Sequence, residues 1–185
     1  MNLTGAIRCF KDAMNHEGLN PEEGLGTEVF CFASTLMPVI NVDLLTINDK
    51  KEILLSWRND PHCGTGWHVP GGCIRFMERI EKRIQETAKT EIGTNVASTQ
   101  DPIRIFEILS REQRQGIEDQ RERAHFITLV YLCKVPEDYI IPSEKNEQGQ
   151  AGALKWFTDL PENLIPIQEC YRTNWDNIKK VILED

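Results

Sequence analysis

The stretch that decides the fold is WHVPGGCIRFMERIEKRIQETAKTEIGT, residues 67–94. Its apolar residues recur at helical spacing, and the pattern predicts a helix over residues 77–92 that ends at Gly93 as a C-cap. With about 100° between successive residues, Glu91 lies about 20° from Ile80, in the middle of the apolar stripe. A carboxylate is therefore expected on the helix face that is turned toward the sheet.

Glu91 needs a positive partner, because an unpaired carboxylate on a core-facing stripe costs several kcal/mol. Either a basic side chain, such as Arg104, or a bound cation would supply the charge. Just upstream, Gly71 and Gly72 let the backbone approach a ligand closely, and their carbonyl oxygens are hard donors. A helix carboxylate together with a glycine carbonyl is typical of one half of a Mg²⁺ or Mn²⁺ site.

The segments on either side of this stretch predict a mixed β-sheet. Residues 39–47 (VINVDLLTI) are nearly all β-branched or aliphatic, as in a buried strand. A turn at residues 48–51 leads into a strand at residues 52–58, which makes a hairpin. Further strand-like segments are expected at residues 29–33, 67–69, 103–109, 125–135 and 155–158. A C-terminal helix, which Thr173 can cap, completes a fold of the α/β or α+β class.

Two parts are expected along the chain. Residues 1–34 form a helical N-terminal extension, since the apolar residues from Leu3 to Met14 have helical spacing and a stretch rich in Gly, Asn and Pro follows them. Residues 35–185 form the main domain and include the C-terminal helix. The charged segment at residues 111–123, with four arginines and four acidic residues, is expected to be solvated, or else to serve as an arm in a dimer or as a lid.

The composition excludes several classes of function. There are 21 Lys and Arg residues against 29 Asp and Glu residues, a formal net charge of −8, so the chain is a poor general binder of nucleic acid or of anionic membranes. An anionic ligand must then be held locally, by a few arginines or by a divalent metal. No apolar run approaches the ~20 residues of a transmembrane helix, and no secretory signal is expected. The six separated cysteines are expected to be reduced thiols of a cytoplasmic protein.

Residues 72–94 resemble the Nudix box, G-x5-E-x7-R-E-U-x-E-E-x-G-U. The positions of the pattern that this chain keeps are Gly72, Glu78, Ala88, Glu91 and Gly93. The resemblance implies a Nudix fold, which is an α-β-α sandwich around a mixed sheet. It also implies one bound Mg²⁺ or Mn²⁺ ion. Taken by itself, Glu78 has a simpler interpretation as a favourable negative charge at the start of a helix.

The departures from the box are themselves informative. The Arg-Glu pair of the pattern is Glu86-Thr87 here, and Thr90 takes the place of the first residue of the Glu-Glu pair. In this respect the chain is similar to the GDP-mannose mannosyl hydrolase branch, which keeps only the last glutamate, holds one divalent metal ion and breaks the sugar–phosphate C–O bond. The similarity covers most of residues 39–157.

This resemblance implies a set of metal ligands and a general base. The Gly71 carbonyl, the Glu91 carboxylate and the Gln150 side chain would ligate the metal. The histidine that serves as general base in the branch aligns with Ala151 in this chain. Glu147 is the nearest alternative base in the same loop.

The resemblance also implies which residues meet the substrate. Arg58 would contact the diphosphate, and Asp43 would contact the nucleotide or its surroundings, with a structural hydrogen bond as the alternative for Asp43. The branch has a phosphate-binding arginine just after the glycine pair, where this chain has Cys73. Arg75, on the same face of an extended segment, is the expected substitute. His125 lies where the branch has a similar residue and is a further candidate contact.

Three functions are open at this point. The favoured one is a Mg²⁺- or Mn²⁺-dependent hydrolase of nucleotide sugars, which releases a nucleoside diphosphate and the free sugar and forms a homodimer, as the branch tends to do. The second is a Nudix pyrophosphohydrolase that cuts between the phosphates of a nucleoside diphosphate derivative; Thr87 and Thr90 disfavour it. The third is a catalytically weak module that binds a nucleotide sugar, which Ala151 favours.

Overall fold

Strand β1 (Val39–Ile47) runs through the middle of an eight-stranded mixed sheet in the computed structural model. The structure describes residues 2–110, 114–147 and 149–184. β1 pairs in parallel with β7 (His125–Lys134) along its whole length. β6 (Arg104–Leu109) and the short β5 (Ala97–Ser98) extend this half of the sheet by antiparallel pairing with β7.

The other half of the sheet separates from β1 and creates a gap. β2 (Ile53–Asp60) joins β1 only beside the hairpin turn, and then pairs with β3 (Gly64–His68) and β8 (Leu154–Phe157). Where β2 has left, the short β4 (Gly71–Cys73) pairs with residues 41–43 of β1. The sheet therefore splits into two arms that diverge beside β4.

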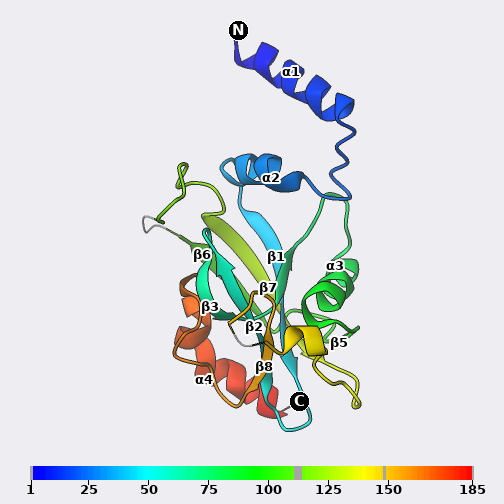
Figure 1. Cartoon of the computed structure of the whole chain (residues 1–185), viewed down its shortest axis with the longest axis vertical. Coiled ribbons are helices and arrows are strands. Elements are labelled where there is room, and N and C mark those ends of the chain that lie inside the picture. Colours follow the sequence, from blue (N-terminus) through cyan, green and yellow to red (C-terminus); the bar gives the residue numbers. More distant parts are fainter. Residues whose placement is uncertain (1, 111–113, 148, 185) are drawn as a thin grey trace.

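Helices cover both faces of the sheet, which gives the expected α-β-α sandwich (Figure 1). α3 (Ile80–Thr87) continues as the π-helix η1 (Ala88–Ile92) and packs on one apolar cluster, while α4 (Glu169–Glu184) packs on a larger cluster on the opposite face. Alternate residues of β1 enter the two clusters, which is why this strand is apolar on both sides. Short 3₁₀-helices, η2 (Ser143–Lys145) and η3 (Pro166–Gln168), lie in the connections.

The N-terminal part is helical, as predicted, but it comprises two helices. α1 (Leu3–His16) stands away from the body of the molecule, whereas α2 (Gly26–Ser34) lies across one end of the sheet (Figure 1). The rings of Phe10 and Phe32 meet edge to face, with 5.9 Å between their centroids. No helix within the part of the chain that the structure describes is long and apolar enough to cross a membrane.

The prediction of a strand at residues 29–33 is wrong, because this segment belongs to α2. Its buried residues are Cys31 and Ser34, three positions apart, which is the spacing of one helix face. An apolar run of five residues does not distinguish a strand from a short buried helix. The hairpin and the strands expected near residues 103–109, 125–135 and 155–158 are confirmed.

Two predicted helix starts are also wrong. The box helix, which consists of α3 and η1 and carries the Nudix-box residues Ala88 and Glu91, begins at Ile80 rather than near residue 77. Met77 has a positive φ of 57°, which a helix cannot contain. The C-terminal helix begins at Glu169, and the Thr173 hydroxyl donates to the Cys170 carbonyl inside it instead of capping its start. Gly93 ends the box helix with φ 91°, as predicted.

Candidate active site

A cavity of about 240 Å³ lies where the sheet splits. Its polar lining comes from both arms of the sheet and from the segments that close them. The side chains that matter below are Asp43, Arg58, His68, Cys73, Arg123 and Gln168, together with the backbone of Gly71 and Gly72. The structure thus brings four of the expected residues, Asp43, Arg58, Gly71 and Gly72, to one place.

Asp43 forms the floor of this cavity and is 2 % exposed. Its carboxylate accepts hydrogen bonds from the Tyr171 hydroxyl at 2.7 Å, from the Gln168 amide at 3.2 Å and from the Asn41 amide at 2.8 Å. Burial raises the pKa of Asp43 to about 7, although these hydrogen bonds and the charge of Arg58 oppose the shift. Asp43 therefore makes structural hydrogen bonds, and it also faces the cavity where a substrate contact is predicted.

Two guanidinium groups reach the cavity. Arg58 comes from β2, and Arg123 comes from the end of the charged segment that precedes β7. The Asp60 carboxylate lies 3.8 Å from Arg58 and 3.5 Å from Arg123, so it balances only part of their charge. In a chain of net charge −8, this is a local basic site suited to an anionic ligand.

His68 adds a neutral imidazole to the same cavity. Its Nδ1 lies 2.7 Å from the Ser56 carbonyl oxygen, and its Nε2 is buried with no hydrogen-bond partner among the described residues. Burial, together with the nearby charge of Arg58, lowers the pKa of His68 to about 3. His68 therefore does not compete with the two arginines for a negative group, but it leaves a polar nitrogen available to a ligand.

The glycine pair lies tightly between β1 and the box helix. A Cβ at Gly71 would clash with the Asp43 carboxylate, and a Cβ at Gly72 would clash with the Thr87 hydroxyl. Only glycine fits at these two positions without displacing those groups. The Thr87 hydroxyl is itself buried, and no hydrogen-bond partner for it is found in the described part of the chain.

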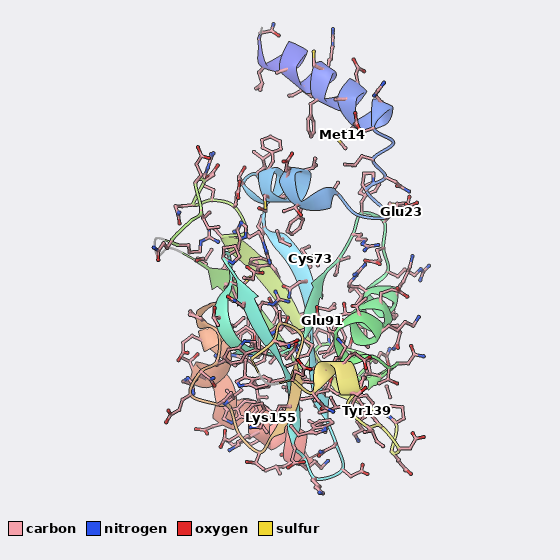
Figure 2. The ribbon with its side chains drawn as sticks, viewed as in Figure 1. Met14, Glu23, Cys73, Glu91, Tyr139 and Lys155 are labelled. Atoms are coloured by element: carbon pink, nitrogen blue, oxygen red, sulfur yellow. The ribbon has the colours of Figure 1, made fainter. Side chains whose placement is uncertain are left out.

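Glu91 lies in the π-helical turn η1 and is half-buried. No hydrogen bond or ion pair of Glu91 is found within residues 2–110, 114–147 and 149–184. The prediction that Arg104 could pair with Glu91 is wrong, because the Arg104 guanidinium donates instead to the Asn174 side chain at 2.7 Å. Figure 2 shows Glu91 on the side of the molecule that carries α3, with Tyr139 of the β7–β8 loop below it.

Glu78 holds the loop between β4 and α3. Its carboxylate accepts two hydrogen bonds from the Arg83 guanidinium, at 2.7 and 2.8 Å, and one from the Arg75 backbone N–H at 3.0 Å. The Arg83 hydrogen bonds, more than any other factor, lower the pKa of Glu78. This bidentate pair fixes the path of the chain from the glycine pair into the helix.

Besides Glu91, four residues predicted to serve the site do not line the cavity: Arg75, His125, Glu147 and Gln150. Arg75 is exposed, and its guanidinium lies beside Gly24. His125 lies 3.4 Å from the Glu107 carboxylate on the neighbouring strand. The amide of Gln150 donates to Glu147, and both side chains are exposed in the β7–β8 loop.

The β7–β8 loop nevertheless rests on the box helix. The Tyr139 hydroxyl donates to the Ile92 carbonyl at 2.8 Å, and the Lys145 ammonium donates to the Thr90 carbonyl at 3.1 Å. The loop that carries Glu147 and Gln150 therefore begins next to the turn that carries Glu91. Their roles as base and metal ligand stay predictions.

Sequence reasoning missed Arg123 and did not select His68 as a site residue. Arg123 belongs to the charged run that is expected to be solvated, yet its side chain is only 19 % exposed, whereas that of Arg121 is 73 % exposed. No local pattern distinguishes these two arginines. For His68 a signal did exist, because it lies directly before the apolar Val69 and three residues before the glycine pair. Residues 111–113 of the same charged run lie outside the described residues.

The comparison with known families agrees with this geometry. A family model described as NUDIX domain matches residues 37–166. The chain belongs to the Nudix family. The match begins just before β1 and ends at the first residue of η3, so it includes the whole sheet and the box helix but not α1, α2 or α4. Membership of the Nudix family supports a hydrolase.

Two solved structures show the same Nudix fold. A MutT protein from Methanosarcina mazei Go1 is similar with a TM-score of 0.55 and 18 % sequence identity, over 77 % of this chain and 96 % of that chain. A UDP-X diphosphatase is similar with a TM-score of 0.55 and 15 % identity, over 97 % of this chain and 80 % of that chain. The second alignment includes the N-terminal part that the family match leaves out.

Nudix hydrolases generally use divalent metal ions, and the residues present here fit such an ion. Glu91 is a carboxylate without a protein partner in the described chain, and the Thr87 hydroxyl beside the glycine pair is a buried oxygen without one. Gly72 cannot carry a side chain, which leaves its backbone open to close approach. Hard oxygen donors of this kind suit Mg²⁺ or Mn²⁺, although the set is poorer in carboxylates than the full box would provide.

Proposed function

We propose that this Nudix protein is a metal-dependent hydrolase of nucleotide sugars, similar to the GDP-mannose mannosyl hydrolase branch, and that it releases a nucleoside diphosphate and a free sugar. One observation carries the proposal: two arginines line the same cavity as the glycine pair, beside a box helix that has threonines where two carboxylates are usual. Such a site has charge for a diphosphate but few ligands for several metal ions.

In this proposal each residue has a defined task. Arg58 and Arg123 bind the diphosphate, which remains the leaving group, and His68 and Asp43 contact the neutral part of the substrate. The Gly71 carbonyl, the Glu91 carboxylate and the Gln150 side chain hold one Mg²⁺ or Mn²⁺ ion. The ion would neutralise the negative charge that develops on the leaving nucleoside diphosphate.

Glu147 is the proposed general base. It lies in the loop that rests on the box helix. Its exposed carboxylate accepts a hydrogen bond from the Gln150 amide and from no other group in the described part of the chain. A base removes the proton of water as the water attacks the anomeric carbon, where an oxocarbenium-like transition state forms. Arg75 and His125 are proposed to contact parts of the substrate that extend beyond the cavity.

A second candidate is hydrolysis between the phosphates of a nucleoside diphosphate derivative. The similarity to a UDP-X diphosphatase over 97 % of this chain supports it. The two candidates share the cavity and the metal and differ in the bond that breaks. Thr87 and Thr90 favour the first candidate, because they reduce the number of carboxylates near the phosphates.

Product analysis separates the candidates. The full chain is incubated with GDP-mannose, GDP-glucose, UDP-sugars and ADP-sugars, with Mg²⁺ or Mn²⁺ and with EDTA, and the nucleotides are resolved by anion exchange. Metal-dependent release of nucleoside diphosphate is expected. Release of nucleoside monophosphate would establish the second candidate instead. If no substrate turns over while the same ligands raise the melting temperature, the protein is a binding module and both candidates fail.

Two variants assign the roles. Glu91→Gln is expected to lose at least about 100-fold of the metal-dependent rate, with Glu81→Gln on the exposed side of α3 as control. Glu147→Gln is expected to lose about 10²–10⁴-fold, with Glu144→Gln in the same loop as control. Full activity of Glu91→Gln would refute the metal assignment, and full activity of Glu147→Gln would refute the base.

A further inference from the structure

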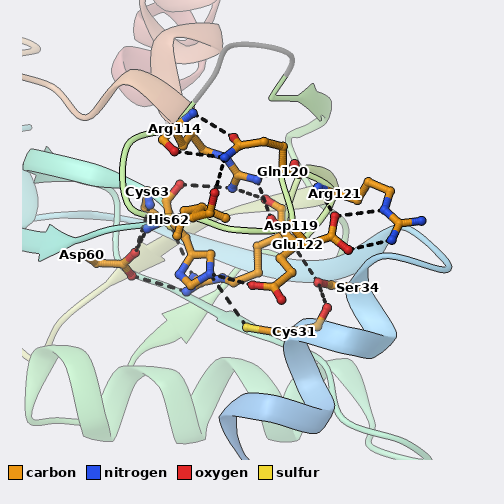
Figure 3. Close-up of polar contacts among 12 residues, drawn as sticks. Cys31, Ser34, Asp60, His62, Cys63, Arg114, Asp119, Gln120, Arg121 and Glu122 are labelled. Carbon is orange, nitrogen blue, oxygen red and sulfur yellow. Dashed lines mark hydrogen bonds and ion pairs between the residues drawn. The ribbon is translucent and has the colours of Figure 1, made fainter.

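A second group of possible metal ligands lies outside the glycine pair and the box helix. It consists of Cys31 on α2, His62 in the turn between β2 and β3, and Glu122 in the segment before β7 (Figure 3). The Cys31 Sγ, a ring nitrogen of His62 and a carboxylate oxygen of Glu122 all lie within 4.8 Å of one another. Three segments that are far apart in the sequence therefore present a thiol, an imidazole and a carboxylate to one point.

The distances within this group suit a metal ion better than they suit hydrogen bonds. His62 Nε2 lies 3.9 Å from Cys31 Sγ and 3.4 Å from Glu122 Oε2. A good N–H···O hydrogen bond is about 2.7–3.2 Å long, so the contact with Glu122 is at most a long and weak one. Tetrahedral zinc with usual bond lengths places ligand nitrogen about 3.6 Å from sulfur and about 3.3 Å from oxygen.

The same nitrogen faces both partners. A neutral imidazole nitrogen has a single lone pair or a single proton, so Nε2 cannot satisfy Cys31 and Glu122 equally by hydrogen bonding. A metal ion between the three atoms would satisfy all of them at once. Cys31 is 7 % exposed, and the side chains of His62 and Glu122 are 14 % and 29 % exposed. One side of the group is thus open enough for a fourth ligand such as water.

The backbone around the group is already held in place. The Asp60 carboxylate accepts the backbone N–H of His62 at 2.8 Å and that of Cys63 at 2.9 Å, which fixes the β2–β3 turn. The Arg114 guanidinium donates to the Glu122 carbonyl at 2.7 Å and to the His62 carbonyl at 3.5 Å. One side chain therefore bridges the segments that carry two of the three ligands, so that little reorganisation is needed to bind an ion.

We propose that Cys31, His62 and Glu122 form a zinc site, with water as the fourth ligand. Thiolate, imidazole and carboxylate are the ligand types that Zn²⁺ uses, whereas Mg²⁺ takes oxygen ligands. A thiolate and a carboxylate together balance the charge of Zn²⁺. Burial and the negative charge of Glu122 raise the pKa of the Cys31 thiol, and a bound cation opposes that effect directly.

The position of the site suggests its role. Glu122 precedes Arg123, and His62 precedes Cys63; both Arg123 and Cys63 line the cavity. Arg123 has a positive φ of 49°, which is unfavourable for a residue with a side chain, and its N–H donates to Ser34 on α2 at 2.8 Å. Zinc would tie α2 and the β2–β3 turn to this strained residue and hold the Arg123 guanidinium in the cavity. This consequence rests on the proposed function, but the zinc site does not.

The first test measures zinc without any substrate. The full chain is stripped with a chelator, incubated with Zn²⁺ in excess Mg²⁺, desalted and analysed for metal by mass spectrometry. One zinc ion per chain is expected, and Glu91→Gln is expected to keep it. Retention of no zinc by the folded wild-type chain would overturn the proposal. Loss of zinc from Glu91→Gln would also overturn the proposal, since the ion would then be bound at the box helix.

Matched variants identify the ligands. Cys31→Ser and Glu122→Gln are expected to weaken zinc affinity in a chelator competition. The loss should exceed about 10–100-fold, which is typical when a residue that only supports a metal ligand is changed. Cys9→Ser on α1 and the exposed Glu118→Gln in the same charged segment are the controls and are expected to keep the affinity. Equal affinity of Cys31→Ser and Cys9→Ser would overturn the proposal.

A third measurement keeps the test independent of whether Cys31→Ser folds. The wild-type chain is alkylated with iodoacetamide, with and without Zn²⁺, and the modified peptides are mapped by mass spectrometry. Zinc is expected to slow alkylation of Cys31 but not of the exposed Cys9. Co²⁺ in place of Zn²⁺ is expected to give a thiolate charge-transfer band. Unchanged alkylation of Cys31 would overturn the proposal.

Discussion

At the scale of single residues, Asp43 joins the stability of the fold to the candidate site. Its carboxylate is almost fully buried, and it is held by Tyr171 and Gln168 from the C-terminal part of the chain. The same group prevents any side chain at Gly71. The position of the glycine pair therefore depends on a buried acid whose charged form is costly.

This cost predicts a pH dependence of stability. The pKa of Asp43 is raised from 3.8 to about 7 in the folded chain, so the folded state holds its proton more tightly than the unfolded state. The stabilisation of the folded state by the protonated Asp43 carboxyl is fully present below about pH 4 and is lost as the pH rises to about 7. Relative to Asp43→Asn, the free energy of unfolding of the wild type is expected to fall across this range, by at most about 4 kcal/mol.

Urea denaturation in EDTA between pH 4 and pH 8 measures this difference. Asp49→Asn, in the exposed β1–β2 turn, is the control and is expected to show no such trend. A constant difference between the wild type and Asp43→Asn would show that Asp43 titrates alike in the folded and unfolded states.

At the scale of elements, the box helix changes its geometry where the site begins. The Gly93 N–H donates to the Ala88 carbonyl, five residues back, at 2.9 Å. A π-helical turn of this kind has more residues per turn than an α-helix, so the estimate of 100° per residue fails beyond Ala88. This is why Ile92 is fully buried and Glu91 is only half-buried, and π-turns of this kind are frequent at functional sites.

The loop that leads into this helix depends on one ion pair. The side chains of Glu78 and Arg83 are 3 % and 11 % exposed, and removal of one partner leaves the other buried and uncompensated. Glu78→Gln is therefore expected to lower the free energy of unfolding by about 3 kcal/mol. Glu81→Gln, exposed in the first turn of α3, is expected to change it by less than about 0.5 kcal/mol.

Denaturant unfolding followed by circular dichroism measures both variants. If Glu78→Gln lowers the free energy of unfolding by less than about 1 kcal/mol, the pair contributes no more than an exposed salt bridge, and its burial does not strengthen it. Arg83→Met is a useful further variant, because it should be destabilised for the same reason.

At the scale of the whole molecule, α1 leaves most of its apolar face exposed, although Phe10 contacts Phe32 of α2. Leu3, Ile7 and Phe10 are 76 %, 47 % and 40 % exposed, and the helix stands away from the sandwich (Figure 1). An amphipathic helix held in this way favours association with a second copy. We propose a homodimer in which α1 is buried.

Light scattering coupled to size-exclusion chromatography tests the dimer. The wild type is expected to elute as a dimer, and the double variant Leu3→Ser, Ile7→Ser is expected to elute as a monomer with the same circular dichroism signal per residue. Asp12→Ser, on the opposite face of α1, is the control. A monomeric wild type, or a double variant that stays dimeric, would refute this interface.

The sequence by itself determined the features that local spacing encodes. The central hairpin, the buried strand β1 with Asp43 inside it, the glycine pair and the box helix with its end at Gly93 could all be predicted, whereas the roles of Asp43, Arg58 and Gly71 stay predictions. Each depends on periodicity, on the backbone freedom of glycine or on a polar residue within an apolar run, and all of these can be recognised within a few neighbouring residues.

Only the tertiary structure decided which distant residues meet. Arg123 differs from Arg121 because the pairing of β7 and the contact with Ser34 turn it inward, and His62 meets Cys31 because α2 lies across the end of the sheet. The π-turn at Ala88 likewise sets the exposure of Glu91. Contacts of this kind join residues that are 31 to 89 positions apart, and the free energy that selects them comes from packing of the whole core rather than from any local pattern.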